Sequence, residues 1–257
     1  MKKSFSDYML EYLNCPADKR DPLNIIIADK IKVKDFIQSY LGKDTGLFDH
    51  ILWTGYDEAE AWKNLKPPCV IKANNAWHRM SFVRTQADIN NKLASDINFY
   101  LNDQRDSWEW YYKKIKPGLL IEKLMPDVHT MYRVYCFGGK PFMFFNQHFD
   151  ISKNSLHHVP DNTFYYANGD MIDVIWDGTP KRHREFNHKL LCEWSEKVAA
   201  FPQGSPPFVR VDFYLVDGHV YFSEMTFSPD AASRHRFAPD DFDYELGREY
   251  EKAIGIK

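Results

Sequence analysis

The segment 208–230 constrains this chain most, because its charged residues follow the pattern of a half-buried β-hairpin. In the first half of the segment, apolar residues alternate with polar ones that begin with Arg210 and Asp212. This period of two is typical of a strand with one buried face. Asp217-Gly218 has the composition of a hairpin turn. The pattern therefore predicts two paired strands that carry charged residues on one face.

The length of the turn decides whether those charged residues can act together. A two-residue turn would place Asp212 and Glu224 on opposite faces, whereas a three-residue loop with Gly218 in the left-handed conformation places them on one face as diagonal neighbours. The second arrangement sets Arg210 opposite Glu224 and separates the two carboxylates by roughly 7–8 Å, so that they could share divalent cations. The alternative is a solvated sheet face with an Arg–Glu pair, which contributes little to stability.

Composition places the chain among ordinary globular proteins and excludes several functions. With 257 residues, 44% hydrophobic and 27% charged, it can form one large or two small α/β domains. The net charge of -3 gives no reason to expect a nucleic-acid partner. No run approaches the ~18 apolar residues of a membrane span, so we expect no membrane insertion and a cytoplasmic location. The scattered cysteines argue against zinc or disulfides: Cys15, Cys69, Cys136 and Cys192.

Charged residues also stand at or near the ends of other predicted strands. Apolar runs predict strands at 69–72, 82–84 and 119–122, and a hairpin at 132–145. Apolar spacing predicts helices near 29–42, 57–65, 89–101 and 190–201. Lys72 and Glu122 end two of the strands. A lysine can neutralise phosphate oxygens and carboxylates can hold the Mg²⁺ that bridges them, so these residues, with those of the hairpin, suggest a nucleotide site.

Several segments together resemble the ATP-grasp superfamily and, within it, the TupA-like family associated with bacterial polysaccharide and teichuronopeptide biosynthesis. The most specific are the hairpin 208–229 and Cys136-Phe137-Gly138-Gly139-Lys140-Pro141. The others, in family order, are residues 21–22, 28–34, 70–74, 120–123 and 132–135. The resemblance extends over most of the chain.

The resemblance implies an α+β fold in which two α+β subdomains sandwich a nucleotide, with a reduced N-terminal part. It implies one ATP-grasp unit over residues 1–257, with a small nucleotide-clasping lobe at 29–124 and a metal-binding central-sheet lobe at 125–257. It also implies an ATP- and Mg²⁺-dependent ligase that phosphorylates a carboxylate and lets an amine displace the phosphate. One such reaction is the amidation of a sugar uronate in surface or capsular polysaccharide biosynthesis.

The resemblance also assigns roles to individual residues. Lys30 and Lys72 would contact the nucleotide phosphates, and the backbone of the hinge segment Glu122-Lys123-Leu124 would meet adenine. Asp212 and Glu224 would ligate Mg²⁺. The catalytic residues would be Arg210, placed against the γ-phosphate or the acyl-phosphate, and Arg133, both stabilising developing negative charge. The alternative for Arg133 is a structural pair with a neighbouring carboxylate.

The chain departs from the family pattern in the loop that follows Lys72. The family usually has a glycine-rich loop there, whereas this chain has Asn74-Asn75-Ala76-Trp77-His78-Arg79. Glycine lets backbone N–H groups approach phosphate closely, so Trp77 or Arg79 would have to take over part of that contact. Two alternatives therefore stay open: a degenerate ATP-grasp protein that binds nucleotide or glycan, and a glycosyl or phosphoryl transferase on the same scaffold.

Two further positions concern the metal and the acceptor. Thr226 stands where many ATP-grasp enzymes have an asparagine ligand, although the TupA-like pattern also has threonine. Arg234 and Arg236 follow the hairpin and could either line an anionic substrate pocket or form a solvated rim.

Overall fold

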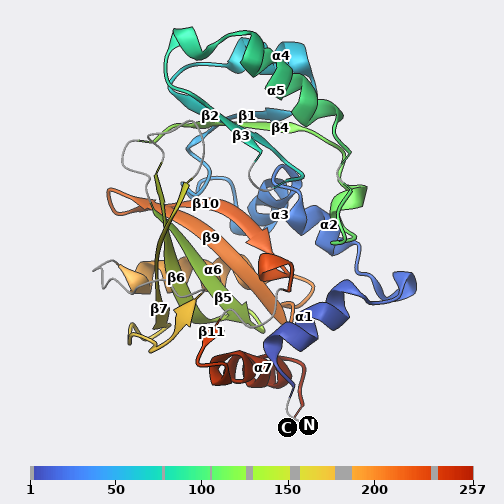
Figure 1. Ribbon diagram of the computed structural model, residues 1–257, viewed down its shortest axis with the longest axis vertical. Coiled ribbons are helices and arrows are strands. Elements are labelled where there is room, and N and C mark those ends of the chain that lie inside the picture. Colours follow the sequence, from blue (N-terminus) through green and yellow to red (C-terminus); the bar gives the residue numbers. More distant parts are fainter. Residues whose placement is uncertain are drawn as a thin grey trace. The chain divides into compact units, whose positions relative to one another are not determined.

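The computed structural model divides the chain into two compact units, each with an antiparallel sheet and helices (Figure 1). The first unit comprises Met1–Asp21, Thr130–His148 and His158–Lys257, and the second comprises Pro22–His129 and Phe149–His157. Residues are described at positions 3–76, 79–104, 106–125, 130–150, 157–176, 187–232 and 237–256. The predicted lobe boundaries, 29–124 and 125–257, stay a prediction.

The second unit is built on a four-stranded sheet in the order β1-β4-β2-β3. Helices α4 (Glu58–Asn64) and α5 (Asn91–Asn102) cover one face of this sheet (Figure 1) and enclose a core with Ile71 and Ile121. Since side chains alternate along a strand, Lys72 and Glu122 lie together on the opposite face. The strands are β1 (Ile51–Gly55), β2 (Cys69–Ala73), β3 (Met80–Val83) and β4 (Leu119–Lys123).

Helix α3 (Lys32–Leu41) follows the short helix α2 (Leu23–Ala28) in this unit. Its start is held by Asp29, whose Oδ1 accepts hydrogen bonds from the backbone N–H groups of Ile31 and Lys32. It ends at Gly42, whose φ of 86° favours glycine. Val33, Lys34 and Ile37 are all buried, so the apolar stripe of this helix carries one lysine into the interior.

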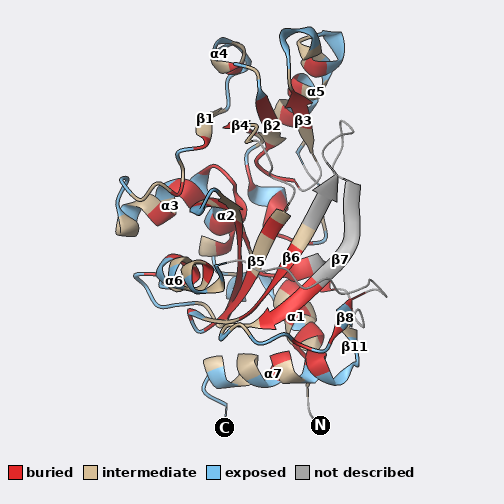
Figure 2. Cartoon of the chain, turned by 90° about the vertical axis from the view of Figure 1, so that its left-hand side faces the viewer, coloured by how far each residue is buried: buried red, intermediate tan, exposed pale blue. Residues whose placement is uncertain are grey.

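The first unit is built on a five-stranded sheet in the order β10-β9-β5-β6-β7. Helix α6 (His188–Ala199) covers one face, where Phe144 stacks on His188 and shares its face with Val134 and Val211. Figure 2 shows buried residues running along β5 and β6. The strands are β5 (Thr130–Phe137), β6 (Lys140–Asp150), β7 (His157–Tyr166), β9 (Phe208–Val216) and β10 (His219–Thr226).

The opposite face of this sheet is partly covered by aromatic side chains. Phe5 of α1 (Phe5–Leu13) lies 4.7 Å from the ring of Phe208, and α1 packs against α7 (Asp241–Ala253). Trp176, in the small sheet of β8 (Ile175–Trp176) and β11 (Phe237–Ala238), lies 5.3 Å from Phe145. The charged residues of β9 follow on the same face.

The hairpin of β9 and β10 differs from the expected three-residue loop. Val216 pairs with His219, so the turn has two residues, and both Asp217 (φ 50°) and Gly218 (φ 77°) are left-handed. The extra residue lies instead in β10, where Ser223 forms a bulge because Phe222 and Glu224 pair with consecutive residues of β9. One extra residue, whether in the turn or in β10, places the side chains of Asp212 and Glu224 on the same face of the sheet.

The bulge also changes which residues oppose one another. Glu224 pairs directly with Asp212 instead of diagonally, and Thr226, not Glu224, stands opposite Arg210. The prediction that the two carboxylates share a face is thus confirmed, whereas the predicted loop length and cross-strand partner of Arg210 are wrong.

Within the described parts of the chain, no helix is both long and apolar enough to cross a membrane.

A substitution at Gly218 should change stability through the backbone conformation alone, because no atom lies within 4 Å of the position that a Cβ would occupy there. Gly218→Ala should lower the free energy of unfolding by about 1 kcal/mol, since alanine is strained at positive φ. Gly218→Asn should lose less because asparagine tolerates this conformation. Urea unfolding of the three proteins tests the turn, and an alanine variant as stable as the wild type would contradict it.

Candidate functional site

A buried charge cluster lies on the sheet face of the second unit that α4 and α5 leave uncovered. Its centre is the carboxylate of Glu122, which is 4% exposed. Lys72 Nζ donates to Glu122 Oε2, and Lys34 Nζ lies 3.4 Å from Oε1. His50 Nε2 lies 3.7 Å from the same Oε1. One carboxylate is therefore shared by two ammonium groups that come from β2 and α3.

The protonation states in this cluster follow from burial and charge. Burial alone raises the pKa of the Glu122 carboxyl, but the ammonium groups of Lys72 and Lys34 outweigh it and hold the pKa well below its usual range. Burial lowers the pKa of Lys34 to about 8 and that of His50 to about 3. At pH 7, His50 is thus neutral, and the two lysines leave the cluster with a net positive charge.

Lys30 lies next to this cluster and holds the loop that follows β2. Its Nζ donates to the carbonyl oxygen of Ala76 at 2.9 Å. Asn74 is fully buried, and its side chain donates to Asp29 Oδ1 at 2.9 Å and accepts from the N–H of Gly118 at 2.7 Å. The side-chain amide of this asparagine therefore fixes a loop that carries no glycine.

Of the two residues expected to replace the glycine-rich contact, only Arg79 is among the described residues. Arg79 forms an ion pair with Asp103, and its guanidinium lies 4.7 Å from the ring centroid of Phe99. Trp77 lies outside the described residues, as do Arg234 and Arg236.

In the hinge segment 122–124, two backbone N–H groups already donate hydrogen bonds within the protein. The N–H of Lys123 donates to the carbonyl of His50 at 2.7 Å, and the N–H of Leu124 donates to the carbonyl of Pro68 at 3.2 Å. An adenine contact through these two N–H groups would require those bonds to break.

A second buried charge cluster lies on the β5-β9-β10 face of the first unit. Arg210 donates from Nε and Nη2 to the two carboxylate oxygens of Asp212, both at 2.7 Å. The same Nη2 lies 3.3 Å from Glu224 Oε1 and 3.2 Å from Thr226 Oγ1. Arg133 Nε lies 3.5 Å from Asp212 Oδ2. Arg133 thus forms an ion pair with a neighbouring carboxylate, which was one of the two alternatives that the sequence left open for it.

The electrostatics of this second cluster differ from those of the first, because burial outweighs the neighbouring cations and the pKa of the central carboxyl is raised. Complete burial raises the pKa of the Asp212 carboxyl, and the guanidinium groups of Arg210 and Arg133 oppose that rise. Burial lowers the pKa of Arg210, but Asp212 outweighs it and raises that pKa above its usual range. Arg210 therefore remains charged.

The hairpin carboxylates suit Mg²⁺ chemically. A carboxylate offers about four lone-pair sites, so the two bonds from Arg210 leave Asp212 with further acceptor capacity. The side chain of Glu224, opposite it, is 21% exposed and can meet a ligand. No group of three or more His, Cys, Asp or Glu residues gathers in the described ranges. The other ligands would be phosphate oxygens and water, which is common for Mg²⁺.

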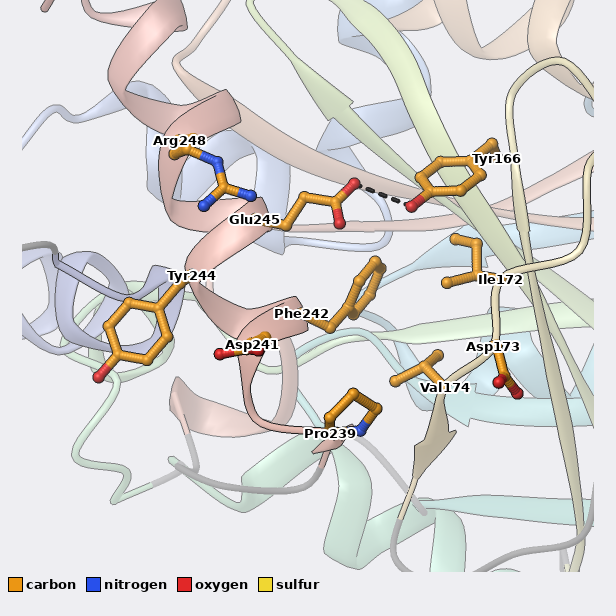
Figure 3. A pocket seen from close by; sticks show the side chains of 10 residues that line it. All are labelled: Tyr166, Ile172, Asp173, Val174, Pro239, Asp241, Phe242, Tyr244, Glu245 and Arg248. Atoms are coloured by element: carbon orange, nitrogen blue, oxygen red, sulfur yellow. Dashed lines mark hydrogen bonds between the residues drawn. The ribbon is translucent and has the colours of Figure 1, made fainter.

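A surface cavity of about 650 Å³ lies elsewhere in the first unit, beside α7 (Figure 3). Tyr166 lines it and donates from its hydroxyl to Glu245 Oε1 at 2.9 Å. The other lining residues are Ile172, Asp173, Val174, Pro239, Asp241, Phe242, Tyr244 and Arg248. None of the site residues predicted from sequence lines this cavity.

The sequence analysis did not identify Lys34 and His50 as members of the charge cluster around Glu122, which is called the lysine cluster below. Lys34 had a visible signal, since it follows Lys30 by four residues and interrupts the apolar stripe of Val33 and Ile37. His50 had none, because only the tertiary fold brings it to Glu122.

Comparison with known proteins supports the fold. The chain matches the model of the family described as TupA-like ATP-grasp over residues 10–251. The VanG D-Ala:D-Ser ligase from Enterococcus faecalis is similar in structure, with 14% identity and a TM-score of 0.54, over 90% of this chain and 62% of that chain. A search of curated protein sequences found no match to this chain.

A D-alanine–D-alanine ligase from Bacillus anthracis complexed with ATP has 18% identity and a TM-score of 0.49, over 90% of this chain and 64% of that chain. The chain thus spans less than two thirds of the length of either ligase. The family match and the VanG similarity confirm the expected α+β ATP-grasp fold.

The shared carboxylate predicts a large cost for Glu122→Gln. This change leaves the buried ammonium groups of Lys34 and Lys72 without their anion, so the free energy of unfolding should fall by about 3 kcal/mol. Adding Lys34→Met should recover part of that loss by removing one unpaired charge. Urea unfolding at pH 7 measures both effects.

The matched control is Glu196→Gln, which removes an ion pair between Lys140 and a 46% exposed glutamate. It should cost less than about 1 kcal/mol. Equal losses for the two glutamine variants would contradict a buried cluster around Glu122.

Burial of His50 predicts a pH dependence of stability. Because its pKa falls from 6.5 to about 3 on folding, only the unfolded state binds a proton between these values. Stability should therefore decrease as pH falls below 6.5, by up to about 1.4 kcal/mol per pH unit from this group. His50→Gln should flatten the profile between pH 6.5 and 5, whereas the exposed His219→Gln should retain the wild-type slope. Thermal unfolding across this range checks the difference.

Proposed function

Because the chain belongs to the TupA-like ATP-grasp family, we propose that it is an ATP-dependent ligase that joins a carboxylate to an amine. The observation that supports this proposal is the pair of buried charge clusters. One has excess positive charge around Glu122, and the other combines two carboxylates with Arg210 and Arg133. Anionic phosphates suit the first, and the metal that bridges phosphates suits the second.

In this proposal the second unit supplies the nucleotide contacts. Lys30 and Lys72 neutralise phosphate oxygens, and the hinge 122–124 lies along adenine. Since the N–H groups of Lys123 and Leu124 are engaged within the protein, the adenine amino group would be met by carbonyl oxygens of the segment. Lys72, with its side chain 12% exposed, is the cluster residue most accessible to a phosphate.

The first unit supplies the metal and the charged groups for transfer. Asp212 and Glu224 would hold Mg²⁺, which when bound neutralises charge on the transferring phosphoryl group. Arg210 carries five N–H donors in a fixed plane, so it can contact a phosphoryl oxygen while still holding Asp212. Arg133 pairs with the same carboxylate and adds a second positive charge.

The proposed reaction has two steps. A carboxylate oxygen of the acceptor attacks the γ-phosphorus of ATP, and ADP leaves with the bonding electrons. The nitrogen of an amine then attacks the acyl carbon, inorganic phosphate leaves, and the nitrogen loses a proton. A sugar uronate is the proposed carboxylate, in the biosynthesis of a surface polysaccharide. The requirement for ATP favours a cytoplasmic location.

A degenerate nucleotide- or glycan-binding protein is the second candidate. Two observations favour it: the loop after β2 carries no glycine and is fixed by the Asn74 amide, and Asp212 already accepts two bonds from Arg210. Such a protein would bind ATP without turning it over, or bind only glycan. A transferase on the same scaffold would differ in its products, a phosphosugar or a consumed sugar nucleotide.

Calorimetric titration of ATP with and without Mg²⁺ tests the proposed site. We expect metal-dependent binding in the micromolar range, lost in Lys72→Ala because a phosphate contact is removed, and lost in Glu224→Gln because a metal ligand is removed. The control Glu196→Gln neutralises an exposed carboxylate of the first unit and should bind like the wild type.

Turnover then separates the candidates. A ligase should release ADP only when both a uronate and an amine are present, and Glu224→Gln should abolish this release without unfolding the protein. Activity retained in that variant would refute the metal assignment. ATP binding without ADP release under any substrate pair would favour the degenerate protein.

A further inference from the structure

The lysine cluster contains one cation more than its central carboxylate can balance. Glu122 has a single negative charge, yet Lys72 donates to one of its oxygens and Lys34 lies 3.4 Å from the other. The two lysines come from β2 and α3, which meet only in the folded protein. Lys34 is 4% exposed, so its charge cannot be balanced by solvent.

We propose that Lys34 is a positioning residue for ATP, whose buried ammonium shares the Glu122 carboxylate and thereby leaves Lys72 with the net positive charge that attracts a phosphate. The inference rests on the proposed function, since it concerns the same nucleotide site. It adds a residue to which no role in nucleotide binding has been assigned.

Charge balance gives the physical reason. Without Lys34, the pair of Glu122 and Lys72 is neutral, and an incoming phosphate would have to compete with the carboxylate for the ammonium. With Lys34 present, the three groups together carry one positive charge. Opposite charges attract more strongly at a partly buried site than in water, so this excess raises affinity for an anion.

Exposure indicates which lysine meets the ligand. The side chains of Lys34 and Glu122 are each 5% exposed, whereas that of Lys72 is 12% exposed. A phosphate would therefore contact Lys72, and Lys34 would act on it through Glu122.

Packing does not account for a lysine at this position. Lys34 lies on the apolar stripe of α3 with Val33 and Ile37, where a methionine would fill the same space. Burial also lowers the pKa of Lys34 to about 8, so its charged form is disfavoured in the folded protein. The groups that face it are Glu122 of β4, Lys72 of β2, Lys30 ahead of α3 and the neutral His50.

The first test measures ATP affinity calorimetrically in the full chain at pH 7.5. Lys34→Met should weaken binding at least tenfold, and Lys34→Arg should restore most of it because the charge returns. The matched control is Lys32→Met, which removes an exposed lysine from the same helix and should leave binding unchanged. Equal affinities for the wild type and Lys34→Met would overturn the inference.

The second test is the pH profile of ATP affinity between pH 7.5 and 9.5, a property that a purely structural lysine would not change. Wild-type affinity should fall across this range, because Lys34 loses its proton near pH 8 and binding then requires proton uptake. Lys34→Arg should bind with a flat profile, since arginine stays charged. A profile as steep in Lys34→Arg as in the wild type would overturn the inference, even if Lys34→Met fails to fold.

Failure of the proposed function has a different signature. A folded wild-type protein that binds no ATP at any pH would refute the nucleotide site and this inference together. Strong ATP binding that is indifferent to Lys34 would refute the inference alone.

Discussion

In each unit of this protein, one buried carboxylate lies between two cationic side chains. Glu122 is held by Lys72 and Lys34, and Asp212 by Arg210 and Arg133. Removing a carboxylate from water costs several kcal/mol unless cations and hydrogen bonds replace the water. In the second unit the cations come from β2 and α3, so both of these elements must lie beside β4 for the carboxylate of Glu122 to be paired.

Strand alternation makes both clusters possible. In the second unit, Ile71 of β2 and Ile121 of β4 face the helices, and the next residue of each strand, Lys72 and Glu122, faces the opposite side of the sheet. In the first unit, regular alternation after the two-residue turn would place Asp212 and Glu224 on opposite faces of the sheet. The bulge at Ser223 adds one residue and returns Glu224 to the face of Asp212.

Local patterns in the sequence predicted most of the regular elements. The helices α3, α5 and α6 have apolar spacing that a single helix face explains, and β2, β4 and the β5-β6 hairpin are bounded by charged residues or glycines. Among the elements that were not predicted, β1 lacks such a pattern. Every residue of β1 is half-buried, so the exposure of its side chains does not alternate. Helices α1 and α7 do have apolar residues at helical spacing, which bury Phe5 and Met9 in α1 and Phe242 and Leu246 in α7.

Sequence patterns were sufficient to identify the family and the fold class, and to single out five residues of the two charge clusters: Lys72, Glu122, Arg210, Asp212 and Glu224. The period of apolar side chains and the order of motifs are properties of the sequence itself, so they can be read without the folded structure. Which cations neutralise which carboxylates could be read only from the folded chain. Lys34 and His50 reach Glu122 across 88 and 72 positions of the chain, and Ser223 rather than the turn sets the register of the hairpin. Such contacts depend on how the elements pack, because a buried charge selects its partners by proximity in space and not by distance along the sequence.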